Sequence, residues 1–168
     1  MFSSLRYEIN PSKERRDCAE RHLNSLPNAA RLLRSIDLAS DFCVVVAMDG
    51  EQLVGVATIK SLVQGKNGEL GHLFVLPEYQ RQGIAKELTR LRIEYAKAHG
   101  LGLLYAVIKD HNEASANNLV QHGFVRYGWF YSLSNSGLKF AWYFMTLAEG
   151  LDAEVVMQTL THPRRRCD

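Results

Sequence analysis

The 168-residue chain contains few cysteines, and no two of them are close together in the sequence. Cys18, Cys43 and Cys167 are odd in number and far apart, so neither a disulfide framework nor a zinc site is predicted. No stretch approaches the ~18 apolar residues of a membrane-spanning helix, and the N-terminus has no apolar signal-peptide core. These absences predict a reduced, cytoplasmic protein with no membrane partner and no metal.

A strong excess of charge of one sign is also missing. Lys and Arg number 20 against 18 Asp and Glu, a net charge of +2. We therefore expect no nucleic-acid partner, and any anion site must be local. The chain contains neither the G-x-x-x-x-G-K-[ST] loop nor the G-x-G-x-x-G dinucleotide fingerprint. What remains is an ordinary globular composition, 46% hydrophobic and 23% charged, without internal repeats.

Apolar runs and helical periodicities predict a mixed α/β fold, because the strict alternation of a doubly wound fold is absent. The expected strands cover residues 5–10, 42–48, 52–60, 69–75, 103–108, 124–133 and 138–147. The expected helices cover 12–39 (split near Pro27), 83–100 and 112–122, with one weak helix after 148. We expect one domain over residues 1–147, and a C-terminal extension over 148–168 that ends in a solvated, mobile basic tail.

The segment 71–86 joins a strand, a proline and a glycine to the start of a helix. Backbone N–H groups at a helix N-terminus suit a pyrophosphate, and Gly83 lets phosphate oxygens approach the backbone. Arg81 and Lys86 add positive charge. Because basic residues at a helix N-terminus oppose the helix dipole unless an anion is bound, an anion site is favoured over an ordinary strand-to-helix turn.

Three parts of the sequence resemble one enzyme family. The run Gln80-Arg81-Gln82-Gly83-Ile84-Ala85 resembles the Q/R-x-x-G-x-G/A signature of the GNAT superfamily of N-acyltransferases. The apolar strand before it, and the element from Asn112 to Phe124, resemble further parts of that family. The resemblance covers about residues 5–147. It implies a GNAT-like mixed, mostly antiparallel sheet flanked by helices, with parallel strands four and five splayed to admit coenzyme A.

The resemblance also implies a donor, an activity and contact residues. Acetyl-CoA would give its acetyl group to a primary amine of a small molecule or peptide, by direct attack in a ternary complex. The residues implied to hold coenzyme A are Leu73, Phe74 and Val75 along the pantetheine arm, and Arg81, Gln82, Gly83, Ile84, Ala85 and Lys86 around the pyrophosphate. Asn112 is implied to lie beside the cofactor arm, although a plain helix cap is an equally open interpretation.

Attack on a thioester needs a neutral amine, so a base helps. Glu69 stands where several members of the family keep a catalytic glutamate, and a solvated strand-end glutamate is the alternative. His72 titrates in the right range, but strand alternation puts it on the opposite face from Glu69 unless a bulge intervenes. We expect a partly buried His72. Leu119 replaces the tyrosine that often protonates the leaving thiolate in this family.

The last hairpin is rich in aromatic residues. Its expected role is a hydrophobic core with a homodimer contact, and an aromatic acceptor pocket is the alternative. Two further functions stay open at this point. One is a non-catalytic acyl-CoA-binding sensor, suggested by Leu119, and the other is an interaction module that uses the hairpin and the basic tail. The sequence does not identify the acceptor amine.

Overall fold

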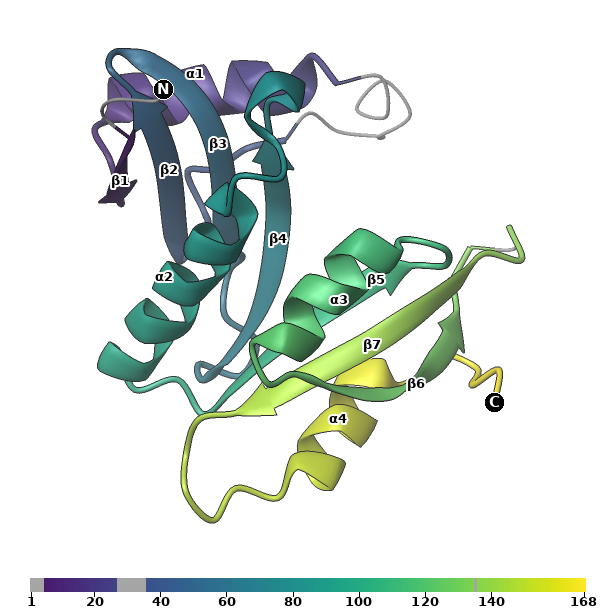
Figure 1. Cartoon of the computed structure of the whole chain (residues 1–168). Coiled ribbons are helices and arrows are strands. Elements are labelled where there is room, and N and C mark those ends of the chain that lie inside the picture. Colours follow the sequence, from purple (N-terminus) through teal and green to yellow (C-terminus); the bar gives the residue numbers. More distant parts are fainter. Residues whose placement is uncertain (1–4, 27–35, 135) are drawn as a thin grey trace. The chain divides into compact units, whose positions relative to one another are not determined.

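A computed structural model of the chain describes residues 5–26, 36–134 and 136–168 (Figure 1). Its strands are β1 (Leu5–Ile9), β2 (Cys43–Asp49), β3 (Gln52–Ile59), β4 (Asn67–Val75), β5 (Leu103–Lys109), β6 (Val125–Tyr131) and β7 (Lys139–Thr146). Its helices are α1 (Lys13–Asn24), the short 3-10 helix η2 (Pro77–Tyr79), α2 (Ile84–Ala98), α3 (Glu113–Gln121) and α4 (Ala153–Thr161). The second half of the first expected helical region falls largely outside the described residues.

The strands follow the hydrogen-bonded order β1-β2-β3-β4-β5-β7-β6. Only β4 and β5 are parallel neighbours among these strands, so the predicted mixed, mostly antiparallel sheet is confirmed. Packing divides the chain into an N-terminal unit, Met1–Ser61 with Leu70–Tyr95, and a C-terminal unit, Leu62–Glu69 with Ala96–Asp168. Strand β4 contributes to both units. The proposed domain boundary at residue 147 stays a prediction.

In the N-terminal unit, alternate residues of a strand pack against different helices, α1 on one face of the sheet and α2 on the other. Val44 and Val46 of β2 pack with Ala19 and Leu23 of α1 in one buried cluster. The face with Ala47 lies under α2 (Figure 1). The period-2 alternation of strand side chains explains how a valine-rich strand supplies both faces of the sheet.

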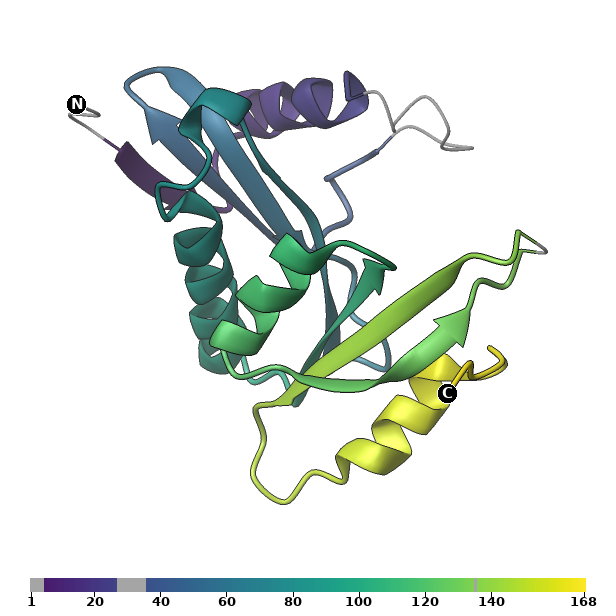
Figure 2. The ribbon, with the colours of Figure 1, turned by 45° about the vertical axis from the view of Figure 1, so that its right-hand side comes forward.

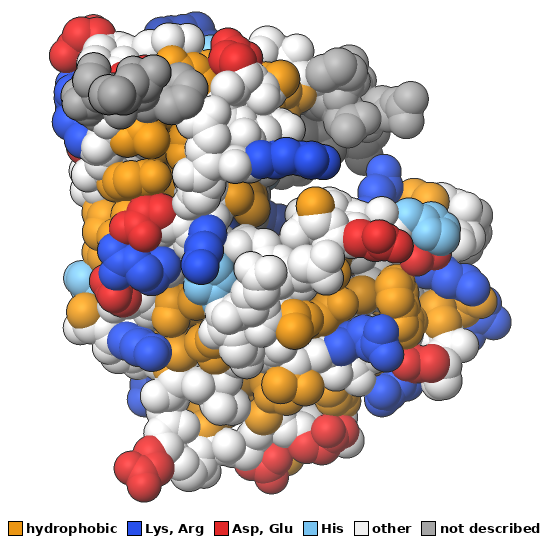
Figure 3. Space-filling model, in the orientation of Figure 1, with side chains coloured by type: hydrophobic (Ala, Val, Ile, Leu, Met, Phe, Trp, Pro, Cys, Tyr) orange, Lys and Arg blue, Asp and Glu red, His pale blue; other side chains and the backbone are white. Residues whose placement is uncertain are grey.

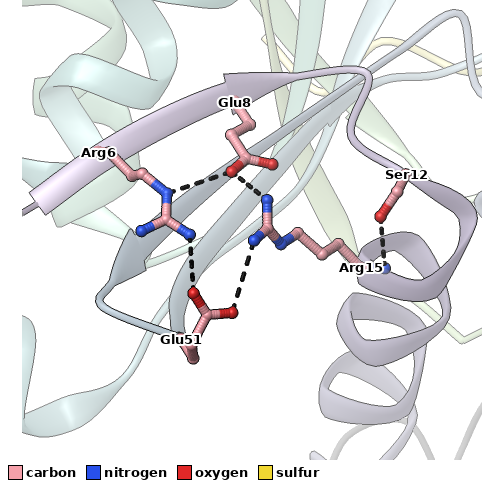
Figure 4. Close-up of polar contacts among 5 residues, drawn as sticks. All are labelled: Arg6, Glu8, Ser12, Arg15 and Glu51. Atoms are coloured by element: carbon pink, nitrogen blue, oxygen red, sulfur yellow. Dashed lines mark hydrogen bonds and ion pairs between the residues drawn. The ribbon is translucent and has the colours of Figure 1, made fainter.

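Four charged side chains tie the start of α1 to the strands beside it (Figure 4). Arg6 Nε lies 3.3 Å from Glu8 Oε1, and Arg15 pairs with the same carboxylate. Arg15 also lies 3.6 Å from Glu51, in the turn between β2 and β3. The hydrogen bond from Arg15 is the main reason that the pKa of Glu8 falls below its usual range. These ion pairs connect β1, α1 and the turn between β2 and β3 to one another.

In the C-terminal unit, helices cover both faces of the β5–β7–β6 strands (Figure 2). Leu103 and Tyr105 of β5, with Trp142 of β7, pack against Met157 of α4 in one buried cluster. Helix α3 lies on the opposite face (Figure 2). The expected core role of the aromatic hairpin is therefore confirmed for Trp142 and Phe130, which are both 5% exposed.

The basic tail is not mobile as expected, because its backbone packs along β6, although the side chains of Arg165 and Arg166 are exposed to solvent as expected. The Tyr131 N–H donates to the Arg165 carbonyl at 2.9 Å, and the Cys167 N–H donates to the Trp129 carbonyl at 2.8 Å. These backbone hydrogen bonds make residues 165–167 a short addition to the edge of β6. A run of arginines indicates solvent exposure, which Arg165 and Arg166 have, but it does not show that the tail backbone pairs with β6.

Charged side chains of both signs are interspersed on the face shown in Figure 3, in keeping with the net charge of +2. Among the described segments, no helix combines the length and the apolar character needed to cross a membrane. In the same part of the chain, no three His, Cys, Asp or Glu side chains gather as a metal site would require.

Candidate active site

A tight turn joins β4 to α2 within the N-terminal unit. The Gln80 side-chain amide donates to the Val75 carbonyl at 3.0 Å and closes the turn. Tyr79 is buried, and its hydroxyl donates to Asp49 Oδ2 at 2.9 Å. The turn is thereby fixed to the end of β2 before the helix begins. This role of Tyr79 was not predicted from the sequence, although an aromatic residue inside a polar turn is a signal for such an anchor.

Gly83 ends the turn and precedes α2. Its φ of +84° is left-handed, and a Cβ there would meet no atom within 4 Å, so this side of the turn is open. The Gly83 carbonyl accepts from the Glu87 N–H at 3.0 Å, which is the first bond of the helix. Ile84 and Ala85 are therefore in the first turn, where N–H groups have no carbonyl to bind within the helix. Of the residues implied to hold pyrophosphate, 81–83 lie at the end of the turn and 84–86 lie in the first turn of α2.

Helix α2 approaches the sheet closely because β3 contains a glycine that sequence analysis missed. A Cβ on Gly55 would lie 3.2 Å from Ile84 Cγ2 and 3.3 Å from Leu88 Cδ1. Both of these side chains are buried. A glycine within a valine-rich strand is a signal for such a close approach. Gly55 thus sets the height of the α2 N-terminus above the sheet.

A β-bulge interrupts β4 just before the turn. Ala57 of β3 faces two residues of β4, His72 and Leu73, and His72 has a φ of +48°. Phe74 and Val75 then resume the pairing with β3. A bulge leaves backbone groups of the extra residue outside the ladder. The residues implied to contact pantetheine, 73–75, therefore begin at the bulge, where the direction of the β4 backbone changes.

Glu69 lies inside β4, because this strand begins at Asn67 and not at Glu69 as expected. Its side chain is half-buried, and its partner in the parallel pairing with β5 is Tyr105. Burial, and then the negative charge of Glu69, raise the pKa of Tyr105 to about 12. Tyr105 therefore keeps its proton at neutral pH. Glu69 occupies a half-buried position beside this phenol and not a fully solvated strand end.

His72, the second candidate base, is half-buried in the N-terminal unit, as expected. The bulge that could break strand alternation is present, and it is located at His72 itself. Burial, and to a smaller extent the positive charge of Lys60, lowers the pKa of His72 below its usual 6.5. The imidazole is therefore neutral at physiological pH and is a weaker base than an ordinary histidine.

Asn112 caps α3, with its Oδ1 accepting from the Ser115 N–H at 3.3 Å. The capping interpretation is confirmed, while contact with the cofactor arm stays a prediction. Leu119 of the same helix is 4% exposed. A buried leucine has no proton to give, so this position cannot act as the acid that protonates a leaving thiolate.

The fold is that of solved acetyltransferases. The protein yncA of Salmonella typhimurium, assigned as an acetyltransferase and solved with acetyl-CoA, is 18% identical, with a TM-score of 0.72 over 89% of this chain and 98% of that one. The ribosomal-protein-S18-alanine N-acetyltransferase of Escherichia coli is 16% identical, with a TM-score of 0.67 over 88% and 99%. At such identities the likeness is one of fold. No curated protein matches the chain in sequence.

A family model described as the acetyltransferase (GNAT) family matches residues 7–124, which is well over half of the chain. The match begins in β1 and ends just after α3. It therefore includes the bulged strand, the turn at Gly83 and the first turn of α2. The chain belongs to the acetyltransferase (GNAT) family and is an acyltransferase.

Proposed function

We propose that the protein transfers the acetyl group of acetyl-CoA to a primary amine of a small molecule or peptide, by direct attack in a ternary complex. The observation that carries this proposal is the turn between β4 and α2, where the open Gly83 precedes a helix N-terminus. Such a terminus favours a bound phosphate through its N–H groups and its dipole. The bulged strand before it offers backbone groups to an extended, amide-containing arm.

The proposed donor contacts follow the chain in order. The pantetheine arm would pair with the backbone of residues 73–75. The pyrophosphate would accept hydrogen bonds from the turn and first helical residues, 81–86, with Arg81 and Lys86 supplying positive charge. Asn112 would approach the arm through its amide nitrogen, because its Oδ1 already accepts the capping hydrogen bond.

The proposed chemistry begins with proton removal by Glu69, directly or through water. The neutral amine nitrogen then attacks the thioester carbonyl carbon. A backbone N–H near Phe74 or Val75 would stabilise the oxyanion that forms. The carbon–sulfur bond breaks as the carbonyl re-forms, the thiolate leaves, and the former amine nitrogen gives up one proton to solvent to become the neutral amide. Because Leu119 has no proton to give, we propose that the thiolate is protonated from solvent.

A screen of amines tests the function. The chain is mixed with acetyl-CoA and a panel of amino acids, polyamines and peptides, and thiol release and acetylated product are measured. We expect amine-dependent thiol release with matching product. Acetyl-CoA binding without product from any amine would instead indicate an acyl-CoA-binding sensor, and no acetyl-CoA binding would indicate an interaction module.

A cytoplasmic homodimer accompanies this proposal. The aromatic hairpin supports it, because Leu133 and Leu138 next to the hairpin turn are 60% and 46% exposed. Light scattering on the purified chain would give the mass of the particle in solution. A monomeric mass at all working concentrations would contradict the dimer.

A further inference from the structure

The arginines of the C-terminal tail lie over aromatic rings of the β6–β7 hairpin. The guanidinium carbon of Arg164 is 4.9 Å from the Trp142 ring centroid, and that of Arg165 is 4.4 Å from the Tyr131 centroid. Arg166 differs from both, because its Nε donates to Asp168 at 2.9 Å. In the described part of the chain, neither Arg164 nor Arg165 forms an ion pair.

These two arginines line a cavity of about 440 Å³ in the C-terminal unit. We call it the arginine pocket, and its lining residues are Tyr131, Ser132, Leu133, Ser134, Gly137, Pro163, Arg164 and Arg165. This lining contains two guanidinium groups and side-chain hydroxyls, and it contains no carboxylate. Stacking on a ring uses the flat face of a guanidinium and does not occupy its in-plane N–H donors. Arg164 Nη1 donates to the Leu160 carbonyl at 3.5 Å, and the other donors of this guanidinium can bind an oxyanion.

The arginine pocket is linked by a row of rings to Glu69 within the same unit. Arg164 lies over Trp142, which stacks on Tyr105 with 5.7 Å between centroids and 2° between planes. Tyr105 is the β5 partner of Glu69. The charges of Glu69 and Arg164 both act on the pKa of Tyr105, in opposite directions. The negative and positive side chains thus stand at the two ends of one row of aromatic residues.

We infer that the arginine pocket binds an anionic group, a carboxylate or a phosphate, of the acceptor whose amine is acetylated. This inference rests on the proposed function and narrows its substrate class. The acceptor would place its amine toward Glu69 and its acidic group between Arg164 and Arg165, with the serine hydroxyls as further donors. Lys139 adds positive charge nearby, since its Nζ lies 5.7 Å from the Tyr131 ring.

Anion binding is tested without any acetyl transfer. Inorganic phosphate and acetate are titrated separately into the full chain, and backbone amide NMR signals of residues 131–134 are followed. We expect saturable shifts with at least one anion, and the anion that binds identifies the acidic group. The double variant Arg164→Gln, Arg165→Gln should lose these shifts. Arg126→Gln is the matched control, because Arg126 lies 5.7 Å over Trp129 and is not among the residues that line the pocket.

A second variant guards against a merely structural effect of the double substitution. Arg164→Lys, Arg165→Lys keeps both charges and loses the fork geometry, so it should restore part of the anion binding lost in the glutamine variant. Saturable shifts that persist in the glutamine variant, or none in the wild-type chain with either anion, would overturn the inference.

A kinetic comparison of acceptor amines is the second test of the inference. A series of ω-amino carboxylates of increasing length is compared with the matching ω-amino amides. We expect kcat/KM to favour one acid over its amide by about 10- to 100-fold, the range of a charge-assisted hydrogen bond, and this preference should vanish in the glutamine variant. Phosphate binding without acetyl transfer to any amine would contradict the proposed function, while the arginine pocket would still be an anion-binding site. Equal kcat/KM for acids and amides, with no anion binding, would contradict the arginine pocket as an anion site and would leave the proposed acetyl transfer unaffected.

Discussion

Among single residues, Glu69 carries the proposed proton transfer, and its replacement gives a direct test. Glu69→Gln keeps the size of the side chain but cannot take up a proton at neutral pH. We expect kcat to fall by about 10²–10⁴-fold, the usual contribution of a general base. The rate of the variant should rise with pH, because more of the acceptor is then already neutral. Acetyl-CoA affinity should hardly change, since the proposed donor contacts are residues 73–75 and 81–86.

The matched control is His72→Asn. Asparagine tolerates the left-handed conformation that His72 adopts, so this substitution removes the imidazole without new backbone strain. Steady-state kinetics should show a kcat close to that of the unsubstituted chain. A large loss in His72→Asn, with little in Glu69→Gln, would transfer the role of base to His72.

A second carboxylate, Asp41, affects stability. Its Oδ2 is buried and has no hydrogen-bond partner in the described part of the chain. Burial is the main reason that the pKa of Asp41 rises from 3.8 to about 6. The folded chain therefore binds this proton more tightly than the unfolded chain does. Protonated Asp41 contributes fully to the free energy of unfolding when the pH is below the pKa that this carboxyl has in the unfolded chain. The contribution is lost as the pH rises through the higher pKa that it has in the folded chain.

Asp41→Asn should therefore stabilise the protein at neutral pH. The gain in free energy of unfolding should shrink as pH falls from about 6 toward about 4, because the original carboxyl is then neutral as well. Denaturant unfolding of both chains at several pH values measures this difference. A gain that is the same at both ends of the range would show that ionisation of Asp41 is not its cause.

At the scale of elements, the position of α2 depends on Gly55. Gly55→Val would drive a branched side chain into Ile84 and Leu88, whose atoms lie 3.2 Å and 3.3 Å from the site of a Cβ. Overpacking of this kind costs about 1–3 kcal/mol of stability and shifts the helix. We expect both lower stability and weaker acetyl-CoA binding, with a smaller effect for Gly55→Ala. Unchanged acetyl-CoA affinity in a destabilised Gly55→Val chain would separate the helix position from donor binding.

The same helix shows what periodicity can and cannot predict. The apolar residues 84, 88 and 91 recur at helical spacing, so α2 was predicted within one or two residues of its bounds. Arg92 was not predicted to be buried, yet it is only 2% exposed. Its guanidinium donates to the Thr58 carbonyl at 3.1 Å and to the Thr89 hydroxyl at 2.9 Å, and burial lowers its pKa to about 10. One of these partners belongs to another element, so sequence spacing cannot show it.

At the scale of the whole molecule, the parts of the candidate site that are local in sequence could be predicted. The turn at residues 81–86 and the cap at Asn112 depend on neighbouring residues, and both are present. The bulge at His72 and the row of rings from Tyr105 to Arg164 could not be predicted. They depend on strand register and on pairs that are distant in the chain, which a single sequence does not contain.

The central claim is that acetyl-CoA is held at the turn that precedes α2. Isothermal titration of acetyl-CoA into Gly83→Asp tests it most directly, because the aspartate adds a negative charge where pyrophosphate should lie. Gly83→Ala controls for backbone strain at this left-handed position. Gly150→Asp introduces the same side chain at another left-handed glycine with no atom within 4 Å of a Cβ.

We predict that Gly83→Asp weakens acetyl-CoA binding by at least about tenfold, or about 1.4 kcal/mol, relative to Gly83→Ala. Gly150→Asp should bind as the unsubstituted chain does. Circular dichroism should show that all three variants are folded. A folded Gly83→Asp chain that binds acetyl-CoA with unchanged affinity would contradict the account.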